Sequence, residues 1–502
     1  LDTKAGQVEY RNLKGETLLA EKPFGTNFLP RKDVNKDSYT VSQSFLLQPD
    51  EVIYGLGQRQ TGAMNHRNQQ IELRNVNTNI CIPYFTSHKG YGVYWDNPGI
   101  SQFNDTPYET SFSSQVGLLS DYYFLYEDGT MDGVISSLRD LTGKATMFPL
   151  WTMGYWQCRE RYKSPDELCG VLDKYRELKV PLDGIVQDWQ YWGCDSNWNA
   201  MKFMNPNYIN KIGDEKWMKY MPNGEQPKKL AKEPRIKSPQ EMVDYVHKQN
   251  AHLMISIWAS FGPWTDQYKE LKEMNALIPF DTWPANSGTA PYDPFNEKAR
   301  DLYWKYLTPM YNMGMDAWWT DSTEPDHFNV KESDFDMMTA DGSFRSVHNA
   351  FPLVTNKGIY EHQREVSDDK RLFLMTRSSY LGQHHYGSFS WSGDVVSSWH
   401  TGLNYMLCGI PFWTTDLAGF FGWEYNNDWN NVAYQELHVR WFQWGCFQPM
   451  MRNHCSSPML NEIWLFGKEG DWAYDAQKRI IELRYRLLPY IYSTAGESVH
   501  KD

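Results

Sequence analysis

The chain has 502 residues, of which 41% are hydrophobic and 22% are charged, and its formal net charge is −13. This composition is typical of a folded globular protein, and the length predicts two or three domains or one large barrel. The sequence has no basic run that could follow a phosphate backbone and no apolar window of about 18 residues, which argues against a nucleic-acid partner and a membrane span. Seven dispersed Cys without CxxC spacing argue against a disulfide framework and a structural zinc site.

Residues 1–147 predict an N-terminal β-sandwich. Short segments of alternating hydrophobicity, such as 39–47 and 90–95, are separated by Gly, Asn and Asp turns. The run at 147–151 marks the boundary with the next domain. Because the chain begins at Leu1 without Met, we expect a processed or trimmed product. Its compartment therefore stays open between periplasmic or secreted, which we favour, and cytoplasmic.

Residues 148–490 alternate strands and helices, the pattern of a (β/α)8 TIM barrel whose active site lies at the C-terminal ends of the strands. Ser164 and Ser238 each precede a Pro and predict helix starts. A long loop insertion is expected over about 194–237, leaning over the active-site face. A helix over 476–492 would close the barrel, and residues 491–502 are expected to begin a further C-terminal β domain. The predicted strands cover 182–189, 253–258, 317–320, 372–376, 387–391 and 410–413, and further helices cover 296–312 and 356–366.

Two of these predicted strands, 317–320 and 387–391, contain aromatic residues and are followed by an Asp, Asp321 and Asp394 respectively. A single strand-end Asp is often only the N-cap of the next helix. Two of them in a chain with 22 Trp favour sugar chemistry, because aromatic faces stack on sugar rings and glycosidic bond cleavage needs two carboxyl groups, one of them protonated. Polar or aromatic residues end five strands on the same face: Asp188, Trp258, Asp321, Arg377 and Asp394.

With these residues in hand, the chain resembles glycoside hydrolase family 31 over nearly its whole length. No single motif is decisive, but together they are highly specific. The matching segments are Tyr54-Gly55-Leu56-Gly57-Gln58-Arg59, Gly184-Ile185-Val186-Gln187-Asp188-Trp189, Trp319-Thr320-Asp321-Ser322-Thr323-Glu324-Pro325, Thr376-Arg377-Ser378-Ser379 with Trp391-Ser392-Gly393-Asp394, Phe412-Trp413-Thr414-Thr415-Asp416-Leu417-Ala418-Gly419-Phe420, and Met451-Arg452-Asn453-His454.

The resemblance implies a retaining, exo-acting hydrolysis of a terminal α-linked sugar in an oligosaccharide or glycoconjugate. It implies Asp321 as the nucleophile and Asp394 as the general acid/base. No metal or cofactor is expected, and the pair His384-His385 has no partner at ligand spacing. The residues implied to bind substrate are Asp188, Trp258, Trp319, Arg377, Trp391, Asp416 and His454, with Asp416 beside the Arg and the His.

The sugar is predicted from two departures from the family's α-glucosidases. Ser322-Thr323-Glu324 stands where many of these have Met-Asn-Glu, and 73 positions separate Asp321 from Asp394, which is short. Both favour an α-xyloside, with an α-N-acetylgalactosaminide second and an α-glucoside third. A xylosidase must exclude a hydroxymethyl group at C5, and Trp189, Trp192 and Trp198 are candidates for that wall. A transglycosylase and a non-catalytic carbohydrate-binding protein remain alternatives, and the oligomeric state stays open.

Overall fold

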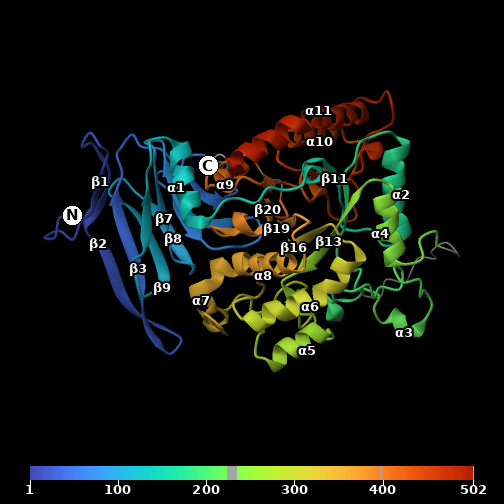
Figure 1. Cartoon of the computed structure of the whole chain (residues 1–502), viewed down its shortest axis with the longest axis horizontal. Helices are drawn as coiled ribbons and strands as arrows, with labels where there is room; N and C mark the ends of the chain where they lie inside the picture. Colours follow the sequence, from blue (N-terminus) through green and yellow to red (C-terminus); the bar gives the residue numbers. More distant parts are fainter. Residues whose placement is uncertain (223–233, 396–397, 501–502) are drawn as a thin grey trace.

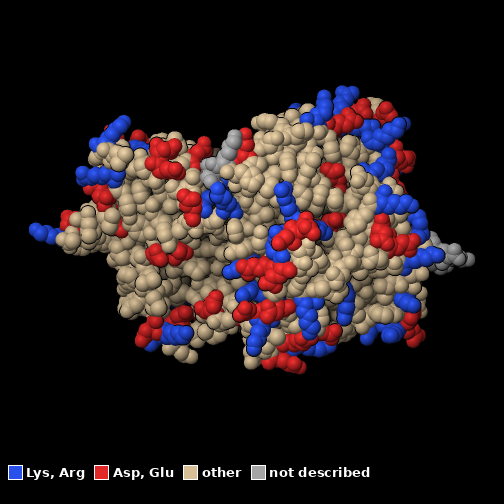
Figure 2. All heavy atoms as spheres, in the orientation of Figure 1, with Lys and Arg blue, Asp and Glu red and all other residues tan. Residues whose placement is uncertain are grey.

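The computed structural model describes residues 1–222, 234–395 and 398–500. A β-sandwich forms one end of the molecule and a barrel of parallel strands surrounded by helices forms the other (Figure 1). On the face drawn in Figure 2, acidic and basic side chains are interspersed without a broad region of one sign. In the described residues, no helix combines the length and the hydropathy that a membrane crossing requires.

The predicted sandwich consists of two antiparallel sheets. Inward-facing residues alternate with outward-facing ones, as in β9, where every second side chain is buried. Phe112 of β9 stacks on Phe85 of the opposite sheet at a centroid distance of 6.0 Å. One sheet has the order β1 (Glu9–Arg11), β2 (Thr17–Asp33), β3 (Lys36–Leu46), β9 (Thr110–Gly117), β8 (Ser101–Asp105), β5 (Gln70–Leu73), and the other β10 (Tyr122–Leu125), β7 (Tyr91–Trp95), β6 (Ile80–Ser87), β4 (Ile53–Gln58).

The barrel is an eight-stranded parallel sheet, as predicted. Its first and last strands in sheet order are β21 and β22. The Thr414 hydroxyl of β21 donates to the carbonyl of Met450, the residue before β22, at 3.0 Å, so the barrel is nearly closed. Two strands, β11 and β22, are missing from the sequence prediction. The sheet order is β21 (Trp413–Thr414), β20 (Ser388–Trp391), β19 (Leu374–Thr376), β16 (Ala317–Asp321), β13 (His252–Trp258), β12 (Gly184–Gln187), β11 (Tyr155–Gln157), β22 (Met451–Asn453).

The helices around the barrel begin where the capping residues place them. Ser164 and Ser238 accept hydrogen bonds from the backbone N–H groups of Glu167 and Glu241, which confirms the two predicted starts. The described helices are α1 (Met131–Thr142), α2 (Pro165–Glu177), α3 (Glu215–Met218), α4 (Pro239–Lys248), α5 (Asp266–Glu273), α6 (Glu297–Met313), α7 (Phe344–Val347), α8 (Phe351–Val366), α9 (Trp399–Met406), α10 (Val432–Gly445) and α11 (Trp472–His500).

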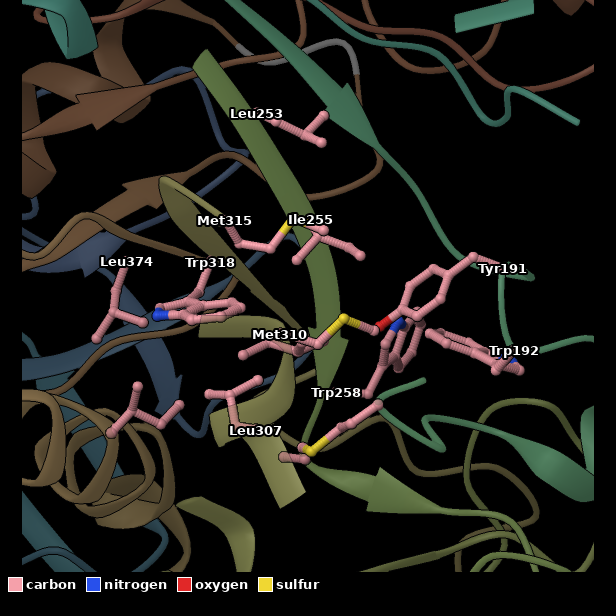
Figure 3. Packing of buried hydrophobic residues seen from close by; sticks show 14 of the residues in the cluster. Tyr191, Trp192, Leu253, Ile255, Trp258, Leu307, Met310, Met315, Trp318 and Leu374 are labelled. Carbon is pink, nitrogen blue, oxygen red and sulfur yellow. The ribbon is translucent and has the colours of Figure 1, made fainter. Parts of the chain in front are cut away.

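Buried side chains of β13, β16 and α6 belong to one large hydrophobic cluster, part of which is shown in Figure 3. Apart from His252 at the start of β13, the residues of the barrel strands are buried, which explains why the predicted strands appear in the sequence as apolar runs without alternation. Two short antiparallel pairs lie in the barrel's loops, β14 (Ser260–Phe261) with β15 (Ala290–Pro291) and β17 (Met338–Thr339) with β18 (Gly342–Ser343).

Two predicted boundaries differ from the structure. The helix predicted over 476–492 is α11, which extends from Trp472 to His500, so residues 491–500 continue a barrel helix and do not begin a β domain. The insertion predicted over 194–237 lies between β12 and α4, and its part at 223–233 is outside the described residues. None of its described residues lines the cavity at the strand ends; Trp198 instead packs on Trp258 at 4.7 Å.

The sandwich is fixed to the barrel through the early Tyr54–Arg59 motif. The N–H groups of Gly55 and Gly57 donate to the Asn404 side chain at 3.1 Å and to the Cys408 sulfur at 3.3 Å. Gly57 has a φ of +85°, and a Cβ there would lie 2.1 Å from the Ile80 carbonyl oxygen. Only glycine at position 57 therefore allows β4 to pass so close to β6. In this position the N–H of Gly57 reaches Cys408 in the turn after α9 (Trp399–Met406).

Candidate active site

A cavity of about 480 Å³ opens at the C-terminal ends of the parallel strands. Seven of the nine predicted site residues line it: Asp188, Trp258, Trp319, Asp321, Arg377, Asp394 and His454. They come from β12, β13, β16, β19, β20 and β22 or from the residues directly after these strands. Parallel strands present their C-terminal ends on one face, so residues more than 250 positions apart meet in one cavity.

Arg377 lies at the centre of the site and is almost fully buried, with 2% of its side chain exposed. Its Nη1 is 3.4 Å from Asp321 Oδ1 and 3.4 Å from Asp394 Oδ2. The two carboxylate oxygens are therefore separated by no more than twice that distance. Retaining glycosidases hold their two carboxyl groups about 5–5.5 Å apart, which this limit includes.

Two further carboxylates share the same guanidinium. Arg377 Nε and Nη2 donate to Glu324 at 2.8 and 3.1 Å, and Nη2 also contacts Asp326. A tight turn after Asp321 returns both acids to the site. Its first residue, Ser322, has a φ of +51°, and its hydroxyl accepts the Asp326 N–H at 3.0 Å.

Four carboxylates around one guanidinium cannot all be ionised at low cost. Burial raises the pKa of Asp321 well above its usual range; Arg377 opposes this and Asp394 adds to it. Burial also raises the pKa of Asp394, while Arg377 and a hydrogen bond from Asn77 oppose the rise. The cluster can therefore keep a proton at a pH where isolated Asp residues are ionised, and its titration belongs to the group as a whole.

The walls of the cavity are aromatic. Trp319 meets Trp391 edge to face at 5.4 Å and His454 at 5.1 Å. Trp391 is fully buried behind Trp319 and does not line the cavity. The lining also includes the aromatic residues Trp283, Phe328, Phe420 and Phe421, none of which was among the predicted substrate-binding residues.

Asp416, predicted to bind substrate, lies in the interior instead. It is fully buried, does not line the cavity, and pairs with Arg452, which is also fully buried. Burial raises the pKa of Asp416 to about 7, against the effect of Arg452. The Arg452 guanidinium lies over the rings of Trp319 and Trp391 at 4.9 and 5.5 Å, so this pair supports the aromatic wall from behind.

Asp188 and His454 line the cavity as predicted. Burial raises the pKa of Asp188 well above its usual range, and nearby Glu160 adds to the effect. Burial lowers the pKa of His454 well below its usual value, so its imidazole is neutral at physiological pH. Within the described part of the chain, His454 Nδ1 and Trp319 Nε1 have no hydrogen-bond partner. Both atoms are also buried, so each is a polar group whose hydrogen-bonding capacity is unmet in that part of the chain.

Six polar residues of the site were not among the predicted site residues: Asn77, Glu160, Glu324, Asp326, Ser456 and Ser457. Glu324 and Asp326 lie in the run that singled out Asp321, and their acidity was a usable signal. Glu160 follows β11, a strand that the sequence analysis did not predict. Asn77 comes from the sandwich, and nothing in its sequence surroundings connects it with the barrel. The described residues contain no group of three or more His, Cys, Asp or Glu suited to hold a metal ion.

A β-sandwich joined to a parallel barrel with two facing carboxylates at the strand ends has the architecture of a TIM-barrel glycoside hydrolase. Residues 145–494 match the glycosyl hydrolases family 31 TIM-barrel domain, and residues 1–104 match the glycosyl hydrolase 31 N-terminal galactose mutarotase-like domain. The chain belongs to glycoside hydrolase family 31, as its motifs indicated.

Among curated proteins, an alpha-xylosidase of Saccharolobus solfataricus is 36% identical over 97% of this chain and 64% of its own length. The chain thus spans less than two thirds of that relative. Alpha-xylosidase A of Aspergillus niger is 27% identical over 95% of this chain and 67% of its own length. Among solved structures, a family 31 alpha-xylosidase from Xanthomonas citri has a TM-score of 0.87 at 26% identity, covering 99% of this chain and 69% of that one. A family 31 alpha-xylosidase from a soil metagenome, complexed with xylose, has a TM-score of 0.84 at 27% identity, covering 99% and 75%.

Proposed function

We propose that the protein is a retaining, exo-acting α-glycosidase that releases a terminal sugar, with an α-xyloside as its preferred substrate. The observation that carries this proposal is the position of Asp321 and Asp394, each 3.4 Å from the same Arg377 nitrogen in one aromatic-walled cavity. The shared nitrogen keeps the two carboxylate oxygens within twice 3.4 Å of each other, a limit that includes the separation of about 5–5.5 Å found in retaining glycosidases.

In the first step, a carboxylate oxygen of Asp321 bonds to the anomeric carbon. The bond from that carbon to the leaving oxygen breaks, and the leaving oxygen keeps the electron pair and takes the proton of Asp394. Asp394 can hold this proton because burial raises its pKa. The product is a glycosyl ester on Asp321 and a free aglycone.

In the second step, Asp394 is ionised and removes a proton from a water molecule. The water oxygen bonds to the anomeric carbon, the bond to Asp321 breaks, and its electron pair returns to the carboxylate. Two displacements on opposite faces leave the configuration unchanged. A sugar hydroxyl in place of the water would give transglycosylation by the same steps, and product analysis at high substrate concentration separates the two.

Exo-action is supported by the polar groups that converge on the cavity. Asp188, Arg377 and His454 directly follow the strands β12, β19 and β22, which lie at different positions around the barrel. We expect all three to bind hydroxyls of one sugar ring. A single monosaccharide product, without oligosaccharides, is expected from an α-xylosylated oligosaccharide.

The preference for xylose rests on Trp189 and on the relatives that are named alpha-xylosidases. Trp189 lines the cavity, whereas Trp192 and Trp198 are fully buried and do not. The Arg161 guanidinium lies 4.6 Å from the centre of the Trp189 ring and holds it in place. Trp189 alone is thus our candidate for the wall that excludes a hydroxymethyl group at C5.

A panel of 4-nitrophenyl α-glycosides of xylose, glucose, galactose and N-acetylgalactosamine tests the sugar. The highest kcat/KM is expected for the xyloside. A clear preference for the N-acetylgalactosaminide or glucoside would replace the sugar but keep the mechanism. Failure to hydrolyse any of the four would contradict the proposed activity and favour a carbohydrate-binding role.

The roles of the two carboxylates are tested by separate substitutions. Asp321→Asn should lose activity on every leaving group, because no other group can form the glycosyl ester. Asp394→Ala should still be glycosylated by an activated aryl glycoside, and azide should then speed turnover by taking the place of water. The expected product is the α-glycosyl azide, because azide attacks from the face that water would use. Unrescuable loss in both variants would contradict the assignment.

A further inference from the structure

The sandwich places a side chain directly on the proposed acid/base residue. Asn77 lies in the loop between β5 and β6, 317 positions from Asp394 along the chain. Its amide nitrogen Nδ2 donates to Asp394 Oδ2 at 2.9 Å, and its amide oxygen Oδ1 accepts the Asp394 backbone N–H at 3.2 Å. Both ends of one amide therefore bind the same residue.

This arrangement determines which way the amide points. The backbone N–H of Asp394 is only a donor, so it must face the amide oxygen, and the NH₂ group then faces the carboxylate. A rotated amide would set a donor against a donor and an oxygen against the carboxylate. The contact is thus a specific pairing.

The two oxygens of Asp394 have different surroundings as a result. Oδ2 accepts hydrogen bonds from Asn77 Nδ2 at 2.9 Å and from Arg377 Nη1 at 3.4 Å. Within the described residues, these are the hydrogen bonds that reach the Asp394 carboxylate, and both end on Oδ2. A proton is disfavoured on an oxygen that already accepts two donors, so Oδ1 is the oxygen that carries it.

The packing around this contact keeps the two domains close. Gly393 has a φ of +77°, and a Cβ there would lie 2.7 Å from Asn77 Oδ1 and 2.8 Å from the Thr78 nitrogen. Gln58 Nε2 donates to the carbonyls of Thr78 at 2.7 Å and Ser392 at 2.9 Å. The Gln58 side chain, fully buried, thereby ties the sandwich loop to the turn that carries Asp394.

We infer that Asn77 is a positioning residue for Asp394, holding Oδ2 as the charged oxygen and presenting Oδ1 with its proton to the leaving oxygen. The inference rests on the proposed acid/base role of Asp394. It gives the sandwich a part in catalysis, because the barrel alone lacks this donor. In the second step the same bond stabilises the carboxylate that accepts a proton from water.

The test is Asn77→Ala, with Asn79→Ala as the matched control. Asn79 lies in the same loop, and its side chain forms no hydrogen bond within the described residues. Rates are measured on aryl glycosides of the preferred sugar whose leaving phenols range from activated to unactivated. General acid catalysis contributes roughly 10²–10⁴-fold, and a misplaced acid should lose part of it. We expect a loss of about 10–100-fold in kcat/KM on the unactivated glycoside and less than about threefold on the activated one.

The pH profile provides a second readout that a purely structural defect would not move. The Asn77 hydrogen bond lowers the pKa of Asp394. Its removal raises that pKa, so the alkaline limb of kcat/KM should move to higher pH in Asn77→Ala and stay in place in Asn79→Ala. An equal loss on all leaving groups with an unmoved alkaline limb overturns the inference.

The proposed function can fail separately. If Asp394→Ala shows neither leaving-group dependence nor azide rescue, the acid/base assignment itself is wrong. If Asp394→Ala shows both and Asn77→Ala behaves like Asn79→Ala, only the role of Asn77 is wrong. So that a loss caused by unfolding of the loop in Asn77→Ala is recognised, Asn77→Asp is measured in parallel. Its added negative charge should raise the pKa of Asp394 by repulsion and move the alkaline limb in the same direction, and an unmoved limb there also counts against the inference.

Discussion

Arg452→Met tests how much the buried pair of Arg452 and Asp416 contributes to the stability of the fold. Both side chains are fully buried, and the substitution leaves the Asp416 carboxylate without its partner. Breaking such a pair costs about 3–5 kcal/mol when the remaining group stays charged. The pKa of Asp416 is already about 7 because of burial, against an ordinary value of 3.8. Ionising it in the folded chain therefore costs on the order of 4 kcal/mol relative to the unfolded chain.

The sign of the pH dependence follows from this raised pKa. The folded chain binds a proton on Asp416 that the unfolded chain has lost, so the contribution of this group to stability falls as pH rises from about 4 to about 7. Arg452 lowers the pKa of Asp416, and its loss raises that pKa further. The variant should consequently lose more stability, relative to the unchanged protein, at pH 8 than at pH 5.5, where Asp416 is protonated.

Thermal unfolding of both proteins at the two pH values measures this difference. Arg452→Met combined with Asp416→Leu removes the buried charge and should recover part of the midpoint lost at pH 8. Equal losses at both pH values, or a double variant no more stable than the single one at pH 8, would refute the reasoning. An unchanged KM for the double variant, with its fold retained, would agree with the position of Asp416 outside the cavity.

Three further outcomes are expected. Asp326→Asn removes a negative charge that raises the pKa of both Asp321 and Asp394, so both limbs of the kcat/KM profile should move to lower pH; a shift upward contradicts the cluster description. Trp189→Ala should raise the ratio of glucoside to xyloside kcat/KM by about 10–200-fold, the range for one additional group in a pocket, and an unchanged ratio would place the C5 wall elsewhere. Gly393→Ala forces a side chain into the left-handed region and against the sandwich loop, at a cost of about 1–2 kcal/mol from the backbone alone. Thermal unfolding and leaving-group dependence measured together should both change, and normal values for both would contradict the close packing.

The sandwich and barrel were predictable because their signals are local. Alternation identifies half-buried strands, and a Ser-Pro pair directly before a run of helical period marks a helix start, as Ser164 and Ser238 illustrate. The strands β11 and β22 are three residues long and include polar residues, Gln157 in β11 and Arg452 and Asn453 in β22, so no continuous apolar run marks them in the sequence. Their existence depends on pairing with each other and with neighbours, which is a property of the closed barrel.

The site was predictable to the extent that each residue lies at the end of a barrel strand. Asp321, Arg377 and His454 do, and the sequence together with the family resemblance identified them. Asp416 follows β21 in the same way but points into the interior, because strand position does not determine whether Arg452 or a substrate satisfies a carboxylate. Asn77 could not be found at all, since its role depends on how a second domain packs on the barrel.

The charge around Arg377 also explains how one Asp can act first as acid and then as base in the proposed mechanism. Before attack, Asp321, Glu324, Asp326 and Asp394 share one guanidinium, and the repulsion between Asp321 and Asp394 favours a proton on the cluster. Formation of the glycosyl ester makes Asp321 neutral. The repulsion is then gone while Arg377 remains, so the pKa of Asp394 falls at the step in which it must accept a proton from water. The change of role therefore needs no movement of the protein, only the loss of one neighbouring charge.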